Sequence, residues 1–400
     1  MTQHRTVMLI LYSIKDGCVK SYIDKKKLYF FETFFIYIDM RSNFMYIKHT
    51  LECIFSFVTH IIYGTYSGVL RARGLLFYRR LLHMDSAKPF KTHDELLDLL
   101  ESRGIDFSSP ESRSFAKKGL QRIGYYNLIN GYSSLFWADS AKDQYISGTT
   151  IEEIYQLYFF DKKMREILLH YILPIETNIK SLIAYYFPQE HSETYYLIYK
   201  NFDTNRKDAN KNITGLIAEL QKQISSRASD PSIAHYLQKY GYVPLWVLNN
   251  ILTLGTISKF YSLMQQKERQ EISKTFRLSD NELESILTYI SSIRNFCAHG
   301  NRLYCFRNKR PLCDTQLHAL MGLDRTSKGE YVYGKRDLFA AMIAFKLTLS
   351  KNDFRRLVKE VDIAYKNFFS RAKIITEEML FSSTGFPSDW KKKLLIDLSK

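Results

Sequence analysis

The chain has 400 residues, 46% hydrophobic and 24% charged, so it can bury a substantial core and is not a disordered polymer. Its formal net charge of +16 favours a polyanionic partner, either nucleic acid or an anionic membrane. Five cysteines, an odd number without a CxxC pair, argue against a disulfide framework. Their spacings match no common zinc pattern, so we expect no metal and no other cofactor.

Residues 1–83 differ in composition from the rest of the chain. They contain 16 Phe and Tyr but no proline, and their apolar residues follow no sustained helical or strand period. Met84 then opens a segment that reads like an ordinary protein start, with Thr92 and Glu95 as a capping box before a leucine-rich helix. We interpret 1–83 as a translated upstream region or a poorly ordered extension, with the native start at Met84.

A membrane anchor is the competing interpretation of this region. Cys53 to Leu70 runs for 18 residues without a formal charge, and several arginines follow it. However, His60, Gly64 and Gly68 dilute its hydrophobicity. We therefore favour a cytoplasmic protein for which contact with a membrane is not expected.

From Met84 onward, segments of helical length alternate with short polar or Pro-containing connections, which predicts an all-α protein. We divide it into an N-terminal helical subdomain, 84–149, and a larger helical domain, 150–400. A capping box at Thr150 and Glu153 opens a long helix, and Pro174 should kink or divide that helix before a second stretch ending near Pro188.

A second capping box, Ser279 with Glu282, opens the helix that carries the candidate site. Its apolar face is made by residues at helical spacing: Leu283, Ile286, Leu287, Ile290, Ile293 and Cys297. The opposite side carries Asn295, His299 and Arg302, whose spacings of four and three predict neighbouring side chains.

The segment from Arg294 to His299 holds the residue types that RNA cleavage needs. Arg294 supplies a permanent cation with a forked set of donors, and His299 supplies a base with an ordinary pKa of about 6.5. The ribose 2′-hydroxyl lies beside its own phosphate, so metal is dispensable. The two residues differ by about 140° on an ideal helix. Joint action therefore requires the Arg side chain to wrap around, a distorted helix, or a second copy across a dimer interface; otherwise both are ordinary surface residues.

Several segments in one order resemble the Abi family of phage-resistance proteins, which includes AbiD and AbiF. They lie between about Pro89 and Lys393 and include Arg122–Tyr132, Phe160–Arg165, Ile175–Lys180, Tyr242–Trp246, Leu252–Tyr261, Ile293–His299 and Asn301–Leu303. The resemblance implies a HEPN-like helical bundle in which R-x4-H motifs from two copies face one another and cut RNA. It also implies that Arg294 binds phosphate, that Asn295 assists, and that His299 acts as general acid or base.

We expect a phage-defence endoribonuclease that forms a homodimer and leaves 2′,3′-cyclic phosphate ends. An antitoxin RNA or protein is a further candidate partner, and whether it holds the protein inactive is left open by the sequence. Weaker candidates for RNA contact are Arg302, Asn301, Arg122, Tyr125 and Tyr126, although for the tyrosines, with Tyr132, a core role is the favoured interpretation. Trp246 is expected to be a buried anchor and Lys391–Lys393 a solvated tail. The alternative function is a non-catalytic RNA-binding or protein-interaction module of a toxin–antitoxin-like system.

Overall fold

The computed structural model describes residues 9–13, 33–37, 90–107, 109–191 and 196–396. The chain divides into two compact units, Met1–Phe90 and Lys91–Lys400. In the first unit, strand β1 (Leu9–Ser13) pairs antiparallel with β2 (Thr33–Tyr37), with Leu9 opposite Tyr37. The expectations about a start at Met84 and a membrane segment at Cys53–Leu70 lie outside the described residues.

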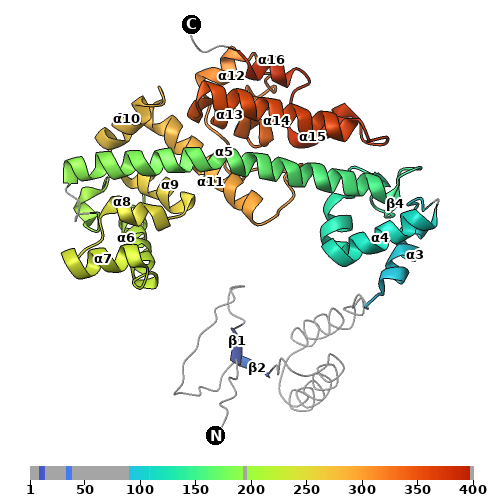
Figure 1. Ribbon diagram of the computed structural model, residues 1–400, viewed down its shortest axis with the longest axis horizontal. Helices are drawn as coiled ribbons and strands as arrows, with labels where there is room; N and C mark the ends of the chain where they lie inside the picture. Colours follow the sequence, from blue (N-terminus) through green and yellow to red (C-terminus); the bar gives the residue numbers. More distant parts are fainter. Residues whose placement is uncertain (1–8, 14–32, 38–89, 108, 192–195, 397–400) are drawn as a thin grey trace, which may run out of the picture. The chain divides into compact units, whose positions relative to one another are not determined.

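The second unit is predominantly helical, which confirms the all-α prediction (Figure 1). Its β structure within the described ranges is a hairpin of β3 (Trp137–Asp139) with β4 (Gln144–Tyr145) and a few isolated bridges. The α-helices are α3 (His93–Ser102), α4 (Pro110–Ile123), α5 (Ile151–His191), α6 (Ala209–Ser226), α7 (Pro231–Tyr240), α8 (Leu245–Leu248), α9 (Leu254–Leu263), α10 (Gln266–Lys274), α11 (Asp280–Ala298), α12 (Gln316–Leu320), α13 (Leu338–Thr348), α14 (Lys351–Phe369), α15 (Glu377–Thr384) and α16 (Trp390–Leu394). Three short helical turns, η1 (Tyr126–Asn130), η2 (Tyr199–Asn201) and η3 (Asn249–Ile251), complete the described helical elements.

Helix α5 is the element around which the second unit is built. It begins where the capping signal predicts, because the Thr150 hydroxyl accepts a hydrogen bond from the Glu153 amide at 3.4 Å. The predicted division at Pro174 is wrong, since α5 continues without interruption to His191. Pro174 has no N–H to donate, but Ile172 and Ile175 beside it are fully buried, and this packing holds the helix together across the lost bond.

The other helices pack on different sides of α5 (Figure 1). Helix α14 lies along one side, whereas α8 and α9 contact it from another. Helix α4 packs against α5, and α3 packs against α4, at the N-terminal end of α5. Helix α11 packs against α5, α9, α10 and α13, so it is held by four neighbours. This central position makes α11 a rigid platform for the side chains on its polar face.

Two expectations about smaller elements are wrong. Trp246 is 42% exposed, and it is the neighbouring Leu245 and Leu248 of α8 that are buried. Lys391–Lys393 is not a loose tail but part of α16. There, Lys391 Nζ lies 2.8 Å from the Asp362 carboxylate, and Lys393 donates to the carbonyl of Met321 at 3.0 Å.

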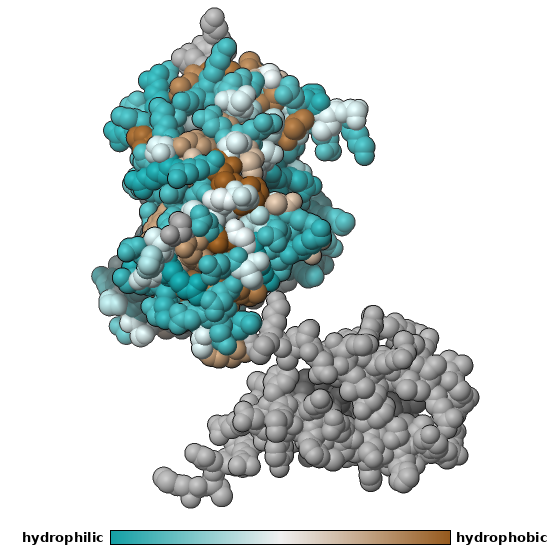
Figure 2. All heavy atoms as spheres, turned by 90° about the vertical axis from the view of Figure 1, so that its right-hand side faces the viewer, coloured by the Kyte–Doolittle hydropathy of each residue, from teal (hydrophilic) through white to brown (hydrophobic). Residues whose placement is uncertain are grey.

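The surface at the α3–α4 end of α5 is mostly hydrophilic, with a smaller hydrophobic area between polar regions (Figure 2). Exposed apolar side chains of α4 and α5 include Phe115 and Phe159, which both contact the ring of Tyr155. None of the helices described here combines the length and the apolar character that crossing a lipid bilayer requires.

Candidate functional site

Helix α11 forms as its sequence predicts. At its start the Ser279 hydroxyl accepts from the Glu282 amide at 3.2 Å, and the Glu282 carboxylate accepts in return from the Ser279 amide at 2.9 Å. The predicted apolar face is confirmed, because its six residues, Leu283, Ile286, Leu287, Ile290, Ile293 and Cys297, are all buried. Burial on one side leaves the other side of the helix free for polar chemistry.

The helix ends at the motif itself. His299 is the C-cap, and Gly300 follows it with φ of +67°. The Asn301 amide donates to the Phe296 carbonyl and the Gly300 amide to the Cys297 carbonyl, both at 3.1 Å. These bonds form a Schellman motif, which needs a left-handed residue and therefore favours glycine. The imidazole of His299 is thus attached to a backbone of defined geometry at the exposed end of a buried helix.

The side chains of the motif occupy different environments. Asn295 and His299 are exposed and stand one helical turn apart, while Arg294 is half-buried. The guanidinium of Arg294 donates to the Asn295 side-chain carbonyl at 3.4 Å, so it bends toward the polar face rather than pointing straight from its own position. Asn295 therefore stands between the cation and the base.

Arg302 does not lie on the helix, contrary to the expected spacing, because α11 ends at Ala298. Its guanidinium instead donates to the carbonyl of Asn130, at the end of η1, at 3.2 Å. The expectation that Arg302 neighbours His299 through helical spacing is therefore wrong. Arg302 ties the segment after the motif to η1.

A buried ionic cluster holds the same segment from beneath. The carboxylate of Asp161 on α5 forms an ion pair with Arg165, accepts from the Tyr132 hydroxyl at 2.7 Å, and accepts from the amides of Leu303, at 3.1 Å, and Tyr304. Arg165 also donates to the carbonyl of Asn301 at 3.1 Å. Burial raises the pKa of Asp161, and Arg165 and the surrounding donors oppose that increase. The cluster connects α5 directly to residues 301–304.

Neither Asp161 nor Arg165 is among the site residues predicted from the sequence. The available signal was a carboxylate at position 161 within an apolar stripe of α5, followed by an arginine four residues later. Such a pair inside a core requires polar partners, because an unpaired buried charge is costly. The partners turn out to lie at residues 301–304, just after the motif.

The candidate RNA-contact residues between Arg122 and Tyr132 differ in how exposed their side chains are. Tyr132 is buried within the ionic cluster, as the core interpretation predicts. Tyr125 is half-buried, accepts from Arg103 at 3.3 Å, and has a pKa raised by burial. The core interpretation is wrong for Tyr126, which is 67% exposed, and Arg122 is also exposed. Tyr126 and Arg122 are therefore the members of this segment with side chains open to a partner.

The cysteines and histidines near the motif lie in separate surroundings. Cys297 is buried, and burial raises the pKa of its thiol to about 12. Cys305 is exposed and Cys313 half-buried, whereas His318 is buried with its ring nitrogens beside Thr315 and the carbonyl of Gly334. Within the described ranges, no group of three or more His, Cys, Asp or Glu is arranged to hold a metal ion.

A known protein family matches the part of the chain that contains the Arg294–His299 motif and the buried ionic cluster. Residues 118–305 match the family of Abi-like proteins. The matched segment of the Abi-like family begins inside α4, includes η1, α5 and α11, and ends just after the ionic cluster. No curated protein and no solved structure matches the chain significantly. The Abi-like segment therefore contains both the Arg294–His299 motif and the residues that position it.

Proposed function

We propose that this chain is an abortive-infection protein that defends against phage by cutting RNA without a metal ion. Arg294 binds the phosphate, His299 transfers a proton, and Asn295 orients one of them. The proposal includes a HEPN-like arrangement in which two copies of the chain bring their motifs together. The Abi-like match over residues 118–305 supports the role in defence.

The observation that carries the proposal is the end of α11. An imidazole and an amide are exposed one turn apart, and a guanidinium bends toward the amide. The Schellman motif and the Asp161 cluster fix the backbone on both sides of His299. A general acid or base is effective when its position is fixed in advance, because no binding energy is then lost in ordering it.

The proposed reaction uses the substrate's own nucleophile. The ribose 2′-oxygen attacks phosphorus, the 2′-hydroxyl loses its proton to a base, and the bond from phosphorus to the 5′-oxygen breaks as that oxygen gains a proton. The products are a 2′,3′-cyclic phosphate and a 5′-hydroxyl. Arg294 stabilises the negative charge of the phosphorane. One His299 serves one proton transfer, and the His299 of the second copy serves the other.

The decisive experiment incubates the purified chain with total RNA in the presence of EDTA. The unchanged protein should cleave RNA and leave cyclic phosphate ends, and a His299→Ala variant of the same thermal stability should not. Equal cleavage by a folded His299→Ala protein would refute the catalytic role of His299.

A non-catalytic RNA-binding module is the second candidate. One observation favours it: the side chains of Arg294 and His299 project from α11 about 140° apart, and the hydrogen bond of the Arg294 guanidinium goes to Asn295, not to His299. In the experiment above, RNA binding without cleavage by either protein would favour this module over the nuclease.

A further inference from the structure

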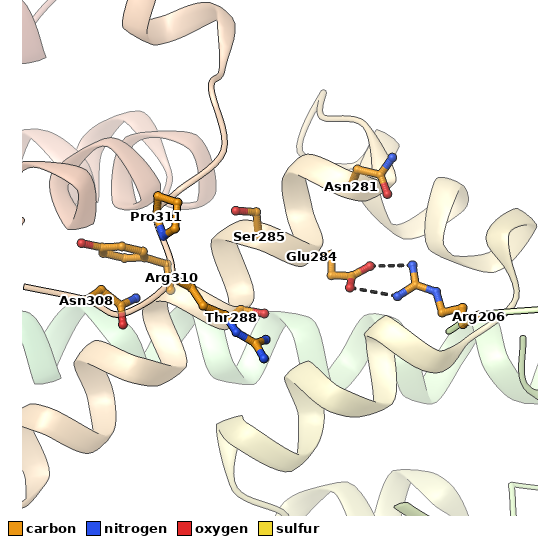
Figure 3. A pocket seen from close by; sticks show the side chains of 9 residues that line it. Arg206, Asn281, Glu284, Ser285, Thr288, Asn308, Arg310 and Pro311 are labelled. Carbon is orange, nitrogen blue, oxygen red and sulfur yellow. Dashed lines mark hydrogen bonds and ion pairs between the residues drawn. The ribbon is translucent and has the colours of Figure 1, made fainter. Parts of the chain in front are cut away.

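A polar groove lies beside α11, away from the Arg294–His299 motif. It consists of two adjoining pockets of about 310 and 570 Å³, which share Arg206, Glu284, Thr288 and Arg310 among their lining residues. Figure 3 shows the first of them, with Ser285 and Thr288 of α11 between Arg206 on one side and Pro311 on the other. The groove is thus formed by elements far apart in the sequence.

Three contacts hold the walls of the groove in place. Arg206, in the turn before α6, makes a bidentate pair with Glu284, with N–O distances of 2.9 and 2.7 Å. On the other side, the segment that returns along α11 is attached twice. Ser292 Oγ lies 3.1 Å from the Asn308 side-chain oxygen, and the Cys313 amide donates to Ser285 Oγ at 3.0 Å. The groove is therefore a preformed feature with α11 as its floor.

The charges that line the groove are mainly positive. Four of the side chains that line the groove are cationic, whereas Glu284 is the one carboxylate in its lining. The bidentate pair neutralises Arg206. Lys207, Lys259 and Arg310 are exposed, and none of them forms an ion pair with a residue in the described ranges. Three uncompensated cations around a polar cavity favour a ligand that carries several negative charges.

The uncharged lining residues define the ligand further. Asn281, Ser285 and Thr288 offer hydrogen-bonding groups, as do residues from the other walls. The aromatic ring in the lining belongs to Tyr289, which is 1% exposed and donates its hydroxyl to the carbonyl of Asp337. The groove therefore provides donors for phosphates and ribose hydroxyls but no open ring on which a base can stack.

The groove and the motif share one face of α11. On an ideal helix, Asn281, Ser285, Thr288, Ser292, Asn295 and His299 all point within about 40° of one direction. Thr288 in the groove and His299 at the helix end are about 16 Å apart along the axis. An extended single strand a few nucleotides long matches this separation.

We propose that this groove binds the sugar–phosphate backbone of single-stranded RNA that continues from the cleavage site at His299. Lys207, Lys259 and Arg310 neutralise successive phosphates, and the side chains of α11 bind the riboses. The inference rests on the proposed function, because it takes RNA as the ligand. Recognition here is independent of base sequence, so the groove adds affinity and orientation rather than specificity.

The test measures RNA binding rather than cleavage. A Lys207→Gln/Lys259→Gln/Arg310→Gln variant is compared with the parent, both carrying His299→Ala so that the RNA stays intact. The ligand is a fluorescently labelled, unstructured RNA oligonucleotide, and anisotropy is recorded at several salt concentrations. Loss of three phosphate contacts should weaken binding about 10- to 100-fold near 0.1 M salt and lower the slope of log K against log salt by about 2.

A charge-matched control removes the same charge elsewhere. Lys328→Gln/Arg355→Gln/Lys359→Gln replaces two lysines and one arginine that are exposed and do not line the groove. This control should bind RNA almost as the parent does, with an unchanged salt slope. All three proteins should share one melting temperature, since every altered side chain is exposed.

The outcomes separate the groove from the nuclease. If the groove variant binds like the control, or if the parent binds no RNA, the groove proposal is overturned, whether or not the protein with His299 restored cuts RNA. If the groove variant loses binding while the protein with His299 restored cuts nothing, the groove stands and the nuclease proposal fails.

Discussion

At the scale of single residues, the buried carboxylate of Asp161 fixes the backbone near the exposed His299. It is fully buried on α5, yet its oxygens accept from the amides of Leu303 and Tyr304, 142 and 143 residues further along the chain. These bonds hold the chain a few residues after His299. The buried ionic cluster therefore supports the backbone that follows the Arg294–His299 motif.

Removing Asp161 should be far more damaging than removing a surface charge. An Asp161→Ala variant leaves the buried Arg165 without its counter-ion and the amides of Leu303 and Tyr304 without their acceptor, which should cost about 3–5 kcal/mol. The neighbouring Lys162→Ala, which breaks only an exposed pair with Glu166, should cost less than about 1 kcal/mol. Urea unfolding of both variants measures the difference, and similar losses would contradict the role assigned to Asp161.

The motif residues should differ in how they affect activity. His299→Ala should lower RNA cleavage by about 10²–10⁴-fold without loss of stability, since the imidazole is exposed. Arg294→Ala should abolish cleavage and also cost some stability, because Arg294 is half-buried. Asn295→Ala should have a milder effect on cleavage, since an amide supplies neither charge nor a titrating proton. Initial cleavage rates, with melting temperatures as controls, decide this order.

At the scale of elements, the end of α11 depends on one glycine. Gly300 has φ of +67° and no atom within 4 Å of the place a Cβ would occupy, so the effect of a side chain there is conformational. Gly300→Ala should destabilise the protein by about 1–2 kcal/mol. Gly215→Ala within α6, at a position without positive φ, should instead stabilise it by up to about 1 kcal/mol. Changes of the same sign would contradict this assignment.

The contact between α5 and α10 should make stability depend on pH. Glu268 is buried against His191, and burial raises its pKa from 4.5 to about 8, while the pKa of His191 is lowered. Glu190 acts in the same direction on Glu268, and Arg269 and Lys267 oppose it. The folded state therefore keeps a proton that the unfolded chain releases. This contribution to stability is present below pH 4.5 and is lost as the pH rises to about 8.

A Glu268→Gln variant isolates this effect, because it keeps the shape and removes the titration. The stability of the native protein relative to this variant should fall between pH 5 and 8, by at most about 1.4 kcal/mol per pH unit. The titration of His191 remains in both proteins and largely cancels. Denaturant unfolding at three pH values measures the difference, and a difference that does not change with pH would rule out a raised pKa for Glu268.

At the scale of the whole molecule, a nuclease in which Arg294 and His299 point in different directions from α11 requires a site shared by two copies. We expect a homodimer in solution with both motifs in one cleft, because a two-fold partner brings one chain's His299 near the other's Arg294. Sedimentation at micromolar concentration measures the state. Mixing Arg294→Ala with His299→Ala chains should restore part of the cleavage, and an active monomer would rule the dimer out.

The sequence by itself determined the features that depend on near neighbours. The capping boxes at Thr92 and Ser279 and the apolar face of α11 involve residues three or four apart, so their free energies are set locally and they can be predicted from spacing. The end of α11 is also marked locally, by Gly300, which favours a helix end before Arg302.

Only the tertiary structure decided how distant segments meet. Pro174 disfavours a continuous helix locally, yet the buried residues around it keep α5 intact. The bonds that Asp161 accepts from Leu303 and Tyr304, and the pair of Arg206 with Glu284, join residues separated by 78 to 143 positions. Spacing along the sequence cannot predict such contacts, because they form only when the core packs. Packing removes the charged side chains from water, and each buried charge then needs a partner.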